Sequence, residues 1–138
     1  MTRSHEQRRK PAPLGPESLL LFDGHAGALP LVLAFEQRLV QRFPETRRRV
    51  RKTQISYFCR YVFACVSFAR VKRKAELPAA WFTLSLGLPG PLDSPRVAAQ
   101  SQIRPGRWTV HLVIGSEDEL DGELLGWLEQ ARTFAERN

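Results

Sequence analysis

The apolar residues of this chain change their spacing twice, and this change limits the fold more than any other feature. Between Ala28 and Phe43 they recur every three or four residues, as on one face of an amphipathic helix. This stripe consists of Leu31, Val32, Phe35, Leu39 and Phe43. Between Thr46 and Ile114 the period falls to two, as in half-buried strands. After Ser116 the helical period returns, so the sequence predicts helix, strands, helix.

Both predicted helices carry terminal signals. Pro30 suits the first turn of the first helix, where a missing N–H costs nothing, and Pro44 ends it. Ser116 and Glu119 form a Ser-x-x-Glu capping box, so we expect the second helix to begin at Ser116. Its predicted buried stripe, with Trp127 beside it, is Leu120, Leu124, Leu128, Ala131 and Ala135.

The middle of the chain is predicted to form about five antiparallel strands. Residues 55–59 and 63–68 are typical of a hairpin with a tight connection at Arg60–Val62, and two longer strands follow at 81–88 and 108–114. The arginine-rich segment 47–52 would be an edge strand. Two amphipathic helices over one face of this sheet make a two-layer α+β domain. The other face would meet water or a ligand.

The composition indicates one domain in a bacterial cytoplasm. The chain has 138 residues, the size of a single domain. Residues 1–16 contain three prolines and four basic residues without an apolar period, so we expect a disordered basic tail before a domain at 17–138. There is no long apolar run and no secretory leader, so we expect no membrane association. The 17 arginines against 4 lysines favour a GC-rich bacterial genome.

Positive charge is concentrated in the middle of the chain. The segment from Arg47 to Lys74 has ten Lys or Arg and no acid, within a total net charge of +7. Such a field favours anionic partners, above all nucleic acid or another polyanion. Tyr57, Phe58 or Tyr61 would be available to stack on bases. The alternative is an edge strand whose charges prevent pairing with other sheets. The candidate nucleic-acid-binding residues are Arg47, Arg49, Arg51, Lys72, Arg73 and Lys74.

Several short motifs resemble a known bacterial family. They are Lys52–Ser56 (KTQIS), Leu92–Arg96 (LDSPR), Pro105–Trp108 (PGRW), Glu119–Asp121 (ELD) and Gly126–Leu128 (GWL). Their order and spacing over residues 17–135 resemble domain of unknown function 5655. The resemblance implies a small α+β module, found alone or appended to other domains, with no established reaction. Relatives often have two adjacent histidines in the last strand, where this chain has Val110 and His111.

The matched regions contain a second candidate site, for a carboxylate or phosphate. Its residues are Lys52, Arg96, Arg107 and His111, because arginine binds both anions through two hydrogen bonds. The structural alternative is that Arg96 pairs with an acid and fixes the turn at Asp93–Pro95. We expect His111 on the open sheet face, as a general base, a ligand or simply a hydrogen-bonded residue.

No metal or cofactor is expected. Cys59 and Cys65 would lie opposite one another if the hairpin turn centred on Val62, but two thiols are too few for a zinc site. We favour two buried, reduced thiols. The acids from Glu117 to Glu123 are explained by helix capping and the helix dipole.

The leading hypothesis is a non-enzymatic binding module for an anionic ligand: nucleic acid, phosphate or an acidic partner. One alternative is an enzyme of unknown reaction that uses His111 with Arg96 and Arg107. Another is a purely structural interaction domain. A deep pocket around His111 would favour the enzyme, and a large apolar patch on a two-fold axis would favour the interaction domain.

Overall fold

The computed structural model describes residues 13–137 of the chain. Most of the predicted disordered tail, residues 1–12, lies outside the described residues. The two helices are α2 (Leu29–Arg42) and α3 (Gly122–Arg137). The strands are β1 (Arg47–Val50), β2 (Gln54–Phe58), β3 (Val62–Ser67), β4 (Phe82–Leu88), β5 (Val97–Arg104) and β6 (Arg107–Ile114). Short 3-10 turns accompany them at Pro16–Ser18 (η1), Ala26–Ala28 (η2), Lys74–Glu76 (η3) and Glu117–Glu119 (η4).

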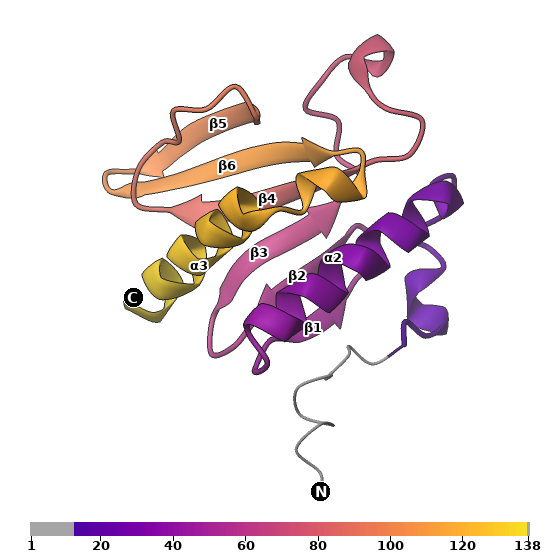
Figure 1. Ribbon diagram of the computed structural model, residues 1–138, viewed down its shortest axis with the longest axis horizontal. Coiled ribbons are helices and arrows are strands. Elements are labelled where there is room, and N and C mark those ends of the chain that lie inside the picture. Colours follow the sequence, from indigo (N-terminus) through magenta and orange to yellow (C-terminus); the bar gives the residue numbers. More distant parts are fainter. Residues whose placement is uncertain (1–12, 138) are drawn as a thin grey trace, which may run out of the picture.

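The strands form one antiparallel sheet in the order β1-β2-β3-β4-β6-β5. Both helices lie on the same face of this sheet, α2 over the β1–β2 side and α3 over β3 and β4 (Figure 1). The predicted two-layer α+β fold is therefore confirmed. No helix among residues 13–137 is long and apolar enough to span a membrane.

The sheet has six strands where the sequence predicts about five, and β5 is the additional one. Its sequence, VAAQSQIR, shows no apolar alternation because most of its side chains are half-buried or exposed. As an edge strand it pairs with β6 alone, and its register shifts twice. A strand that buries neither face leaves no period of two in the sequence.

The core lies between the helices and the sheet. Phe35 of α2 packs edge-on against Tyr57, with ring centroids 5.5 Å apart, and contacts Phe82 at the same centroid distance. Leu124 and Leu128 of α3 are fully buried against the same layer. The helix faces predicted from the sequence are confirmed by this burial.

The last helix begins later than predicted. The capping box of Ser116 and Glu119 closes only the 3-10 turn η4, where the Glu119 carboxylate accepts hydrogen bonds from Ser116 N–H (3.1 Å) and Gly115 N–H (2.6 Å). The chain then turns at the buried Leu120. Asp121 starts α3 by accepting a 3.0 Å hydrogen bond from Leu124 N–H. A second capping residue therefore separates the turn from the helix.

Candidate functional site

A line of polar side chains crosses the sheet face that the helices leave uncovered, here called the open face. The register pairs Arg49 with Ser56, Ser56 with Cys65, Cys65 with Ser85, and Ser85 with His111. Directly paired residues point to the same face, so these side chains form one row across five strands. The intervening positions, such as Ile55, Val66 and Leu84, belong to the core on the other face. We call the line of five side chains the polar row.

The polar row is connected by hydrogen bonds. The Ser85 hydroxyl and His111 Nδ1 share one of 2.7 Å, and burial lowers the pKa of His111. Gln54 Nε2 donates to the Ser56 hydroxyl at 3.1 Å, and this hydroxyl lies 3.8 Å from Cys65 Sγ. Burial raises the pKa of the Cys65 thiol, an effect that the contact with Ser56 partly offsets. At neutral pH the row therefore presents an imidazole, hydroxyls and a thiol in their uncharged forms.

Two arginines bracket an aromatic ring at the β1 end of the open face. The guanidinium carbons of Arg47 and Arg49 lie 5.4 Å and 5.1 Å from the centre of the Phe58 ring. Both arginines are exposed and Phe58 is half-buried. Arg47 also donates a long hydrogen bond of 3.5 Å to the Cys59 carbonyl. Arg47, Phe58 and Arg49 are below called the arginine–phenylalanine cluster.

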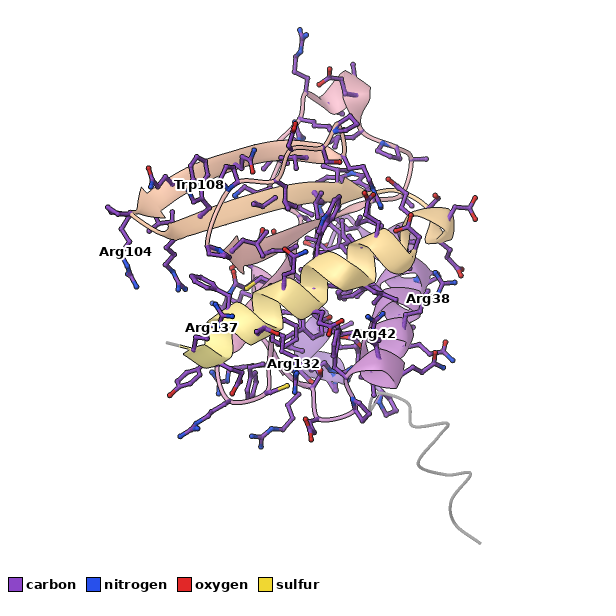
Figure 2. The ribbon with its side chains drawn as sticks, turned by 60° about the vertical axis from the view of Figure 1, so that its left-hand side comes forward. Arg38, Arg42, Arg104, Trp108, Arg132 and Arg137 are labelled. Carbon is purple, nitrogen blue, oxygen red and sulfur yellow. The ribbon has the colours of Figure 1, made fainter. Side chains whose placement is uncertain are left out.

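The charges of the two faces differ. None of the six strands contains Asp or Glu, and within residues 13–137 Arg47 and Arg49 form no ion pair. Three arginines of the two helices, labelled in Figure 2, form ion pairs instead. Arg38 pairs with Glu117, Arg42 with Glu129 and Arg132 with Glu45. Positive charge without a protein partner is thus concentrated on the open face and in the turns.

The long loop between β3 and β4 covers one end of the open face. Thr83 faces that side, is fully buried, and donates a 2.8 Å hydrogen bond to the Ala69 carbonyl. Val113, its partner on β6, is also buried. The loop carries Lys72, Arg73 and Lys74, all exposed, and with η3 it projects past the sheet in Figure 1.

The predicted nucleic-acid-binding residues therefore lie in three places. Arg47 and Arg49 belong to the open face, whereas Lys72, Arg73 and Lys74 belong to the loop. Arg51 and Lys52 lie in the exposed β1–β2 turn, at the loop end of the sheet, because Gln54 pairs with Ser67 there.

The three aromatic residues proposed for base stacking differ in accessibility. Tyr57 is buried on the helix side, where its hydroxyl donates a 2.6 Å hydrogen bond to Glu36, so no base can reach it. Phe58 is on the open face. Tyr61 is exposed in the β2–β3 turn, with the Arg60 guanidinium 5.7 Å from its ring centre.

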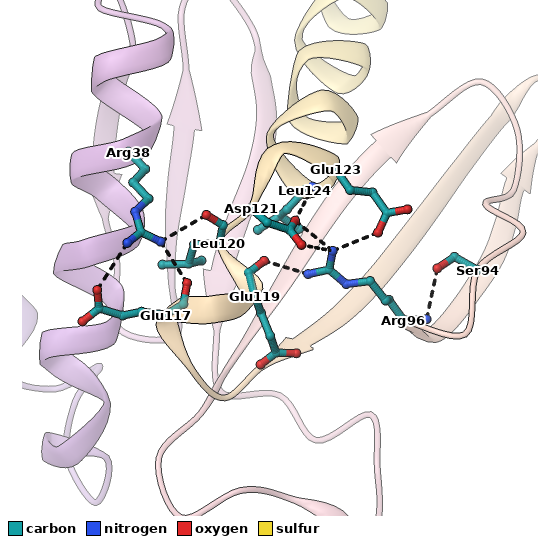
Figure 3. A network of polar contacts seen from close by, with 9 residues as sticks. All are labelled: Arg38, Ser94, Arg96, Glu117, Glu119, Leu120, Asp121, Glu123 and Leu124. Atoms are coloured by element: carbon teal, nitrogen blue, oxygen red, sulfur yellow. Dashed lines mark hydrogen bonds and ion pairs between the residues drawn. The ribbon is translucent and has the colours of Figure 1, made fainter.

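Arg96 connects the loop before β5 to the start of α3 on the helix side of the sheet. Its guanidinium donates to Asp121 (3.0 Å), Glu123 (3.0 Å) and the Glu119 carbonyl (2.7 Å), as Figure 3 shows. It also lies 5.4 Å from the centre of the Trp127 ring. Its pKa is raised: burial acts to lower it, but the bonds to the two acids outweigh burial. This is the structural alternative stated for Arg96, in which an ion pair fixes the loop before β5.

The second predicted anion site is not assembled. His111 is on the open face, as expected, whereas Arg96 is on the opposite side of the sheet. The Arg107 guanidinium lies 5.7 Å from the ring centre of Phe134 in α3, and Lys52 is in a distant turn. An enzyme that combines His111 with Arg96 and Arg107 would need these side chains to converge, and they do not.

Ser85 and His111 lie on two interior strands, β4 and β6, whose backbone N–H groups are not free to stabilise an oxyanion. A serine–histidine pair needs hydrogen-bond donors that stabilise an oxyanion. β4 and β6 each pair with strands on both sides, so their backbone N–H groups are used within the sheet. The arrangement favours binding through hydrogen bonds over acyl transfer.

The cysteines do not face one another. The β2–β3 turn comprises residues 59–61 and Phe58 pairs with Val62, so Cys65 lies opposite Ser56 and Cys59 lies in the turn. The turn is centred on Arg60 and not on Val62, so the condition for the two cysteines to lie opposite one another is not met. Both thiols are half-buried rather than buried, and Cys59 Sγ accepts a 3.3 Å hydrogen bond from Arg132 Nε.

Most of the polar row was missed from the sequence. Ser56, Cys65 and Ser85 each stand between two apolar residues of a strand, which is the available signal. That signal places each of them on the uncovered face, but it cannot show that they are neighbours. Neighbours on a sheet are decided by strand order and register.

The family model for a domain of unknown function (DUF5655) matches residues 21–135. The chain belongs to this family. The match covers both helices up to α3 residue 135, all six strands and the polar row, and confirms the resemblance stated from the motifs. For this DUF5655 domain, neither the comparison with curated proteins nor that with solved structures gives a match.

Proposed function

We propose that this DUF5655 domain is a non-enzymatic module that binds single-stranded nucleic acid on its open face. The observation that supports this most is the arginine–phenylalanine cluster on a sheet without acidic residues. Two guanidinium groups that form no ion pair within residues 13–137 can contact phosphates, and the neighbouring Phe58 ring can stack on a base.

The polar row extends this surface. Ser85 and His111 are half-buried and offer a hydroxyl and an imidazole group that can hydrogen-bond to bases or sugars, whereas Ser56 is buried. They lie beside Arg49 in one continuous line, so a strand laid across the sheet would meet charge first and neutral polar groups next.

The test is fluorescence anisotropy with a labelled oligothymidine and with a duplex of equal length, over a salt series. We expect binding weaker than about 1 μM at physiological salt, and a slope of log K against log salt near −0.7 per phosphate contacted. Arg49→Gln and Phe58→Ala should both weaken binding. Arg47→Gln should reduce the salt slope by about 0.7, one contact.

Arg42→Gln is the matched control. It removes the same charge from the helix side, where Arg42 pairs with Glu129, and it should leave binding unchanged. Equal losses for Arg42→Gln and Arg49→Gln would mean that net charge alone drives association. No binding at about 50 mM salt would remove nucleic acid as a ligand, since the electrostatic contribution is large there. The arginines of β1 would then serve to protect the sheet edge.

A further inference from the structure

A hollow of about 460 Å³ lies at the end of the sheet, between residues 24–28 and the second half of the β3–β4 loop. His25, Arg70, Lys74 and Trp81 line it, together with small and apolar residues at 24–28 and 77–80. Its size is in the range of small-molecule sites. This hollow is called the basic pocket below.

The histidine of the basic pocket is held in place. The His25 ring stacks on Phe68, with centroids 4.1 Å apart and planes 3° from parallel, and meets Trp81 edge-on at 5.7 Å. The His25 backbone donates a 2.8 Å hydrogen bond to the Phe22 carbonyl and accepts one of 3.0 Å from Ala28 N–H. Ring and backbone are therefore fixed before any ligand arrives.

The opposite wall is anchored as well. Pro78 packs so closely on Gly115 that a Cβ there would lie 2.4 Å from Pro78 Cγ. The start of the same loop is fixed by the bond between Thr83 and Ala69. The basic pocket thus lies between two positioned segments, a requirement for a site that binds without large reorganisation.

The charge around the basic pocket is positive. Arg70 and Lys74 are exposed, and neither forms an ion pair within residues 13–137. Within the described part of the chain, residues 13–137, no acid lines the hollow. Asp23 and Glu76 each directly precede a residue that lines the hollow, but neither lines it. The Glu76 carboxylate accepts a 3.2 Å hydrogen bond from Arg73 N–H. Cations beside a wall of rings, proline and alanine match a ligand with an anionic group and a flat apolar part.

We propose that the basic pocket binds a nucleoside 5′-monophosphate group, either free or at the end of a strand. Arg70 and Lys74 hold the phosphate, and the base lies against the apolar wall near His25 and Pro78. This site is separate from the polar row and does not depend on binding at the open face.

The test is calorimetric titration of the full chain with 5′-AMP, adenosine and inorganic phosphate at low salt. We expect 5′-AMP to bind in the range of about 1 mM or tighter, and tighter than either fragment. Arg70→Gln and Lys74→Gln should each weaken it about tenfold, as expected for losing one hydrogen bond to a charged group. Gly27→Leu, which adds bulk at the wall without changing charge, should also weaken it.

Arg73→Gln is the matched control, since Arg73 belongs to the same loop but does not line the basic pocket. It should leave 5′-AMP binding unchanged. A titration of oligothymidines with a 5′-phosphate or a 5′-hydroxyl end tests whether the ligand is a free nucleotide or the end of a strand. A site for a terminal nucleotide prefers the oligothymidine with the 5′-phosphate. No 5′-AMP binding, or equal losses for Arg70→Gln and Arg73→Gln, would overturn the proposal.

Discussion

The Tyr57 hydroxyl donates a 2.6 Å hydrogen bond to the Glu36 carboxylate, joining β2 to α2 inside the core. The other carboxylate oxygen of Glu36 accepts a hydrogen bond from Arg48 Nη1 of β1. Burial raises the pKa of Glu36, although both bonds act to lower it, and burial together with Glu36 raises the pKa of Tyr57. These three residues are the polar centre of the layer between α2 and the sheet.

Replacing Tyr57 or Glu36 should destabilise the fold, and the loss should be larger when the charge of Glu36 is removed. Tyr57→Phe removes one hydrogen bond to a charged group and should cost about 1.5–3 kcal/mol. Glu36→Gln removes the buried negative charge to which both Arg48 and Tyr57 donate, and it should cost more, about 3–5 kcal/mol for a buried pair. Urea unfolding of the single and double variants measures both. Additive losses in the double variant would show that Tyr57 and Glu36 act independently.

Leu124→Ala should be among the most destabilising apolar replacements. Leu124 is fully buried where α3 meets the sheet, so truncation leaves a cavity and should cost about 2–5 kcal/mol. Leu19→Ala makes the same chemical change at a residue 72% exposed and should alter the free energy of unfolding by less than about 0.5 kcal/mol. Equal losses in urea unfolding would contradict the assigned face of α3.

His111 should titrate below the ordinary histidine pKa of 6.5, because burial disfavours its charged form. The imidazole Cε1–H resonance in an NMR pH series, assigned with His111→Gln, measures this. The unfolded chain binds the proton on His111 more readily than the folded chain does. The folded state is therefore favoured by a neutral His111 above pH 6.5, and this advantage is lost as pH falls through the folded pKa. Ser85→Ala should keep the pKa low; a return to 6.5 would mean that Ser85, not burial, causes the shift.

Asp121 should link stability to acid pH. Its pKa is lowered first by the hydrogen bond from Leu124 N–H and then by Arg96. A lowered carboxyl pKa stabilises the fold above the ordinary value of 3.8, and this stabilisation is lost as pH falls through the folded pKa. Asp121→Asn keeps a capping side chain but loses the charge. Thermal unfolding should show wild type more stable at pH 6 and the difference vanishing towards pH 2; a constant difference would contradict a role for the charge.

Arg96→Lys should weaken the attachment of the loop before β5. Lysine keeps the charge but cannot reach Asp121, Glu123 and the Glu119 carbonyl with one planar group. We expect a loss of about 1–2 kcal/mol, as for one or two hydrogen bonds. Faster amide exchange at residues 92–100 should accompany it, and unchanged exchange there would contradict the anchoring role.

Local patterns were sufficient for the fold class. The helical stripe around Phe35 and Leu39 and the alternation in β4 and β6 follow directly from burying one face of each element, so the sequence determined two helices and a sheet with a covered and an open face. It also placed His111 on the open face. It failed at β5, whose side chains are buried on neither face, and at the start of α3, where two successive capping signals competed.

Which residues meet was decided by tertiary structure. Alternation along the strand separates Arg48 from Arg47 and Arg49, but only the structure shows that Arg48 faces Glu36 and that the other two lie beside Phe58. Nor could the sequence show that Arg96 forms ion pairs with Asp121 and Glu123. It also could not show that Ser56, Cys65, Ser85 and His111 form one row. These relations depend on strand order, register and a bulge between residues distant in the chain. The periodicity of a sequence records which side of an element is buried, not which element lies next to it.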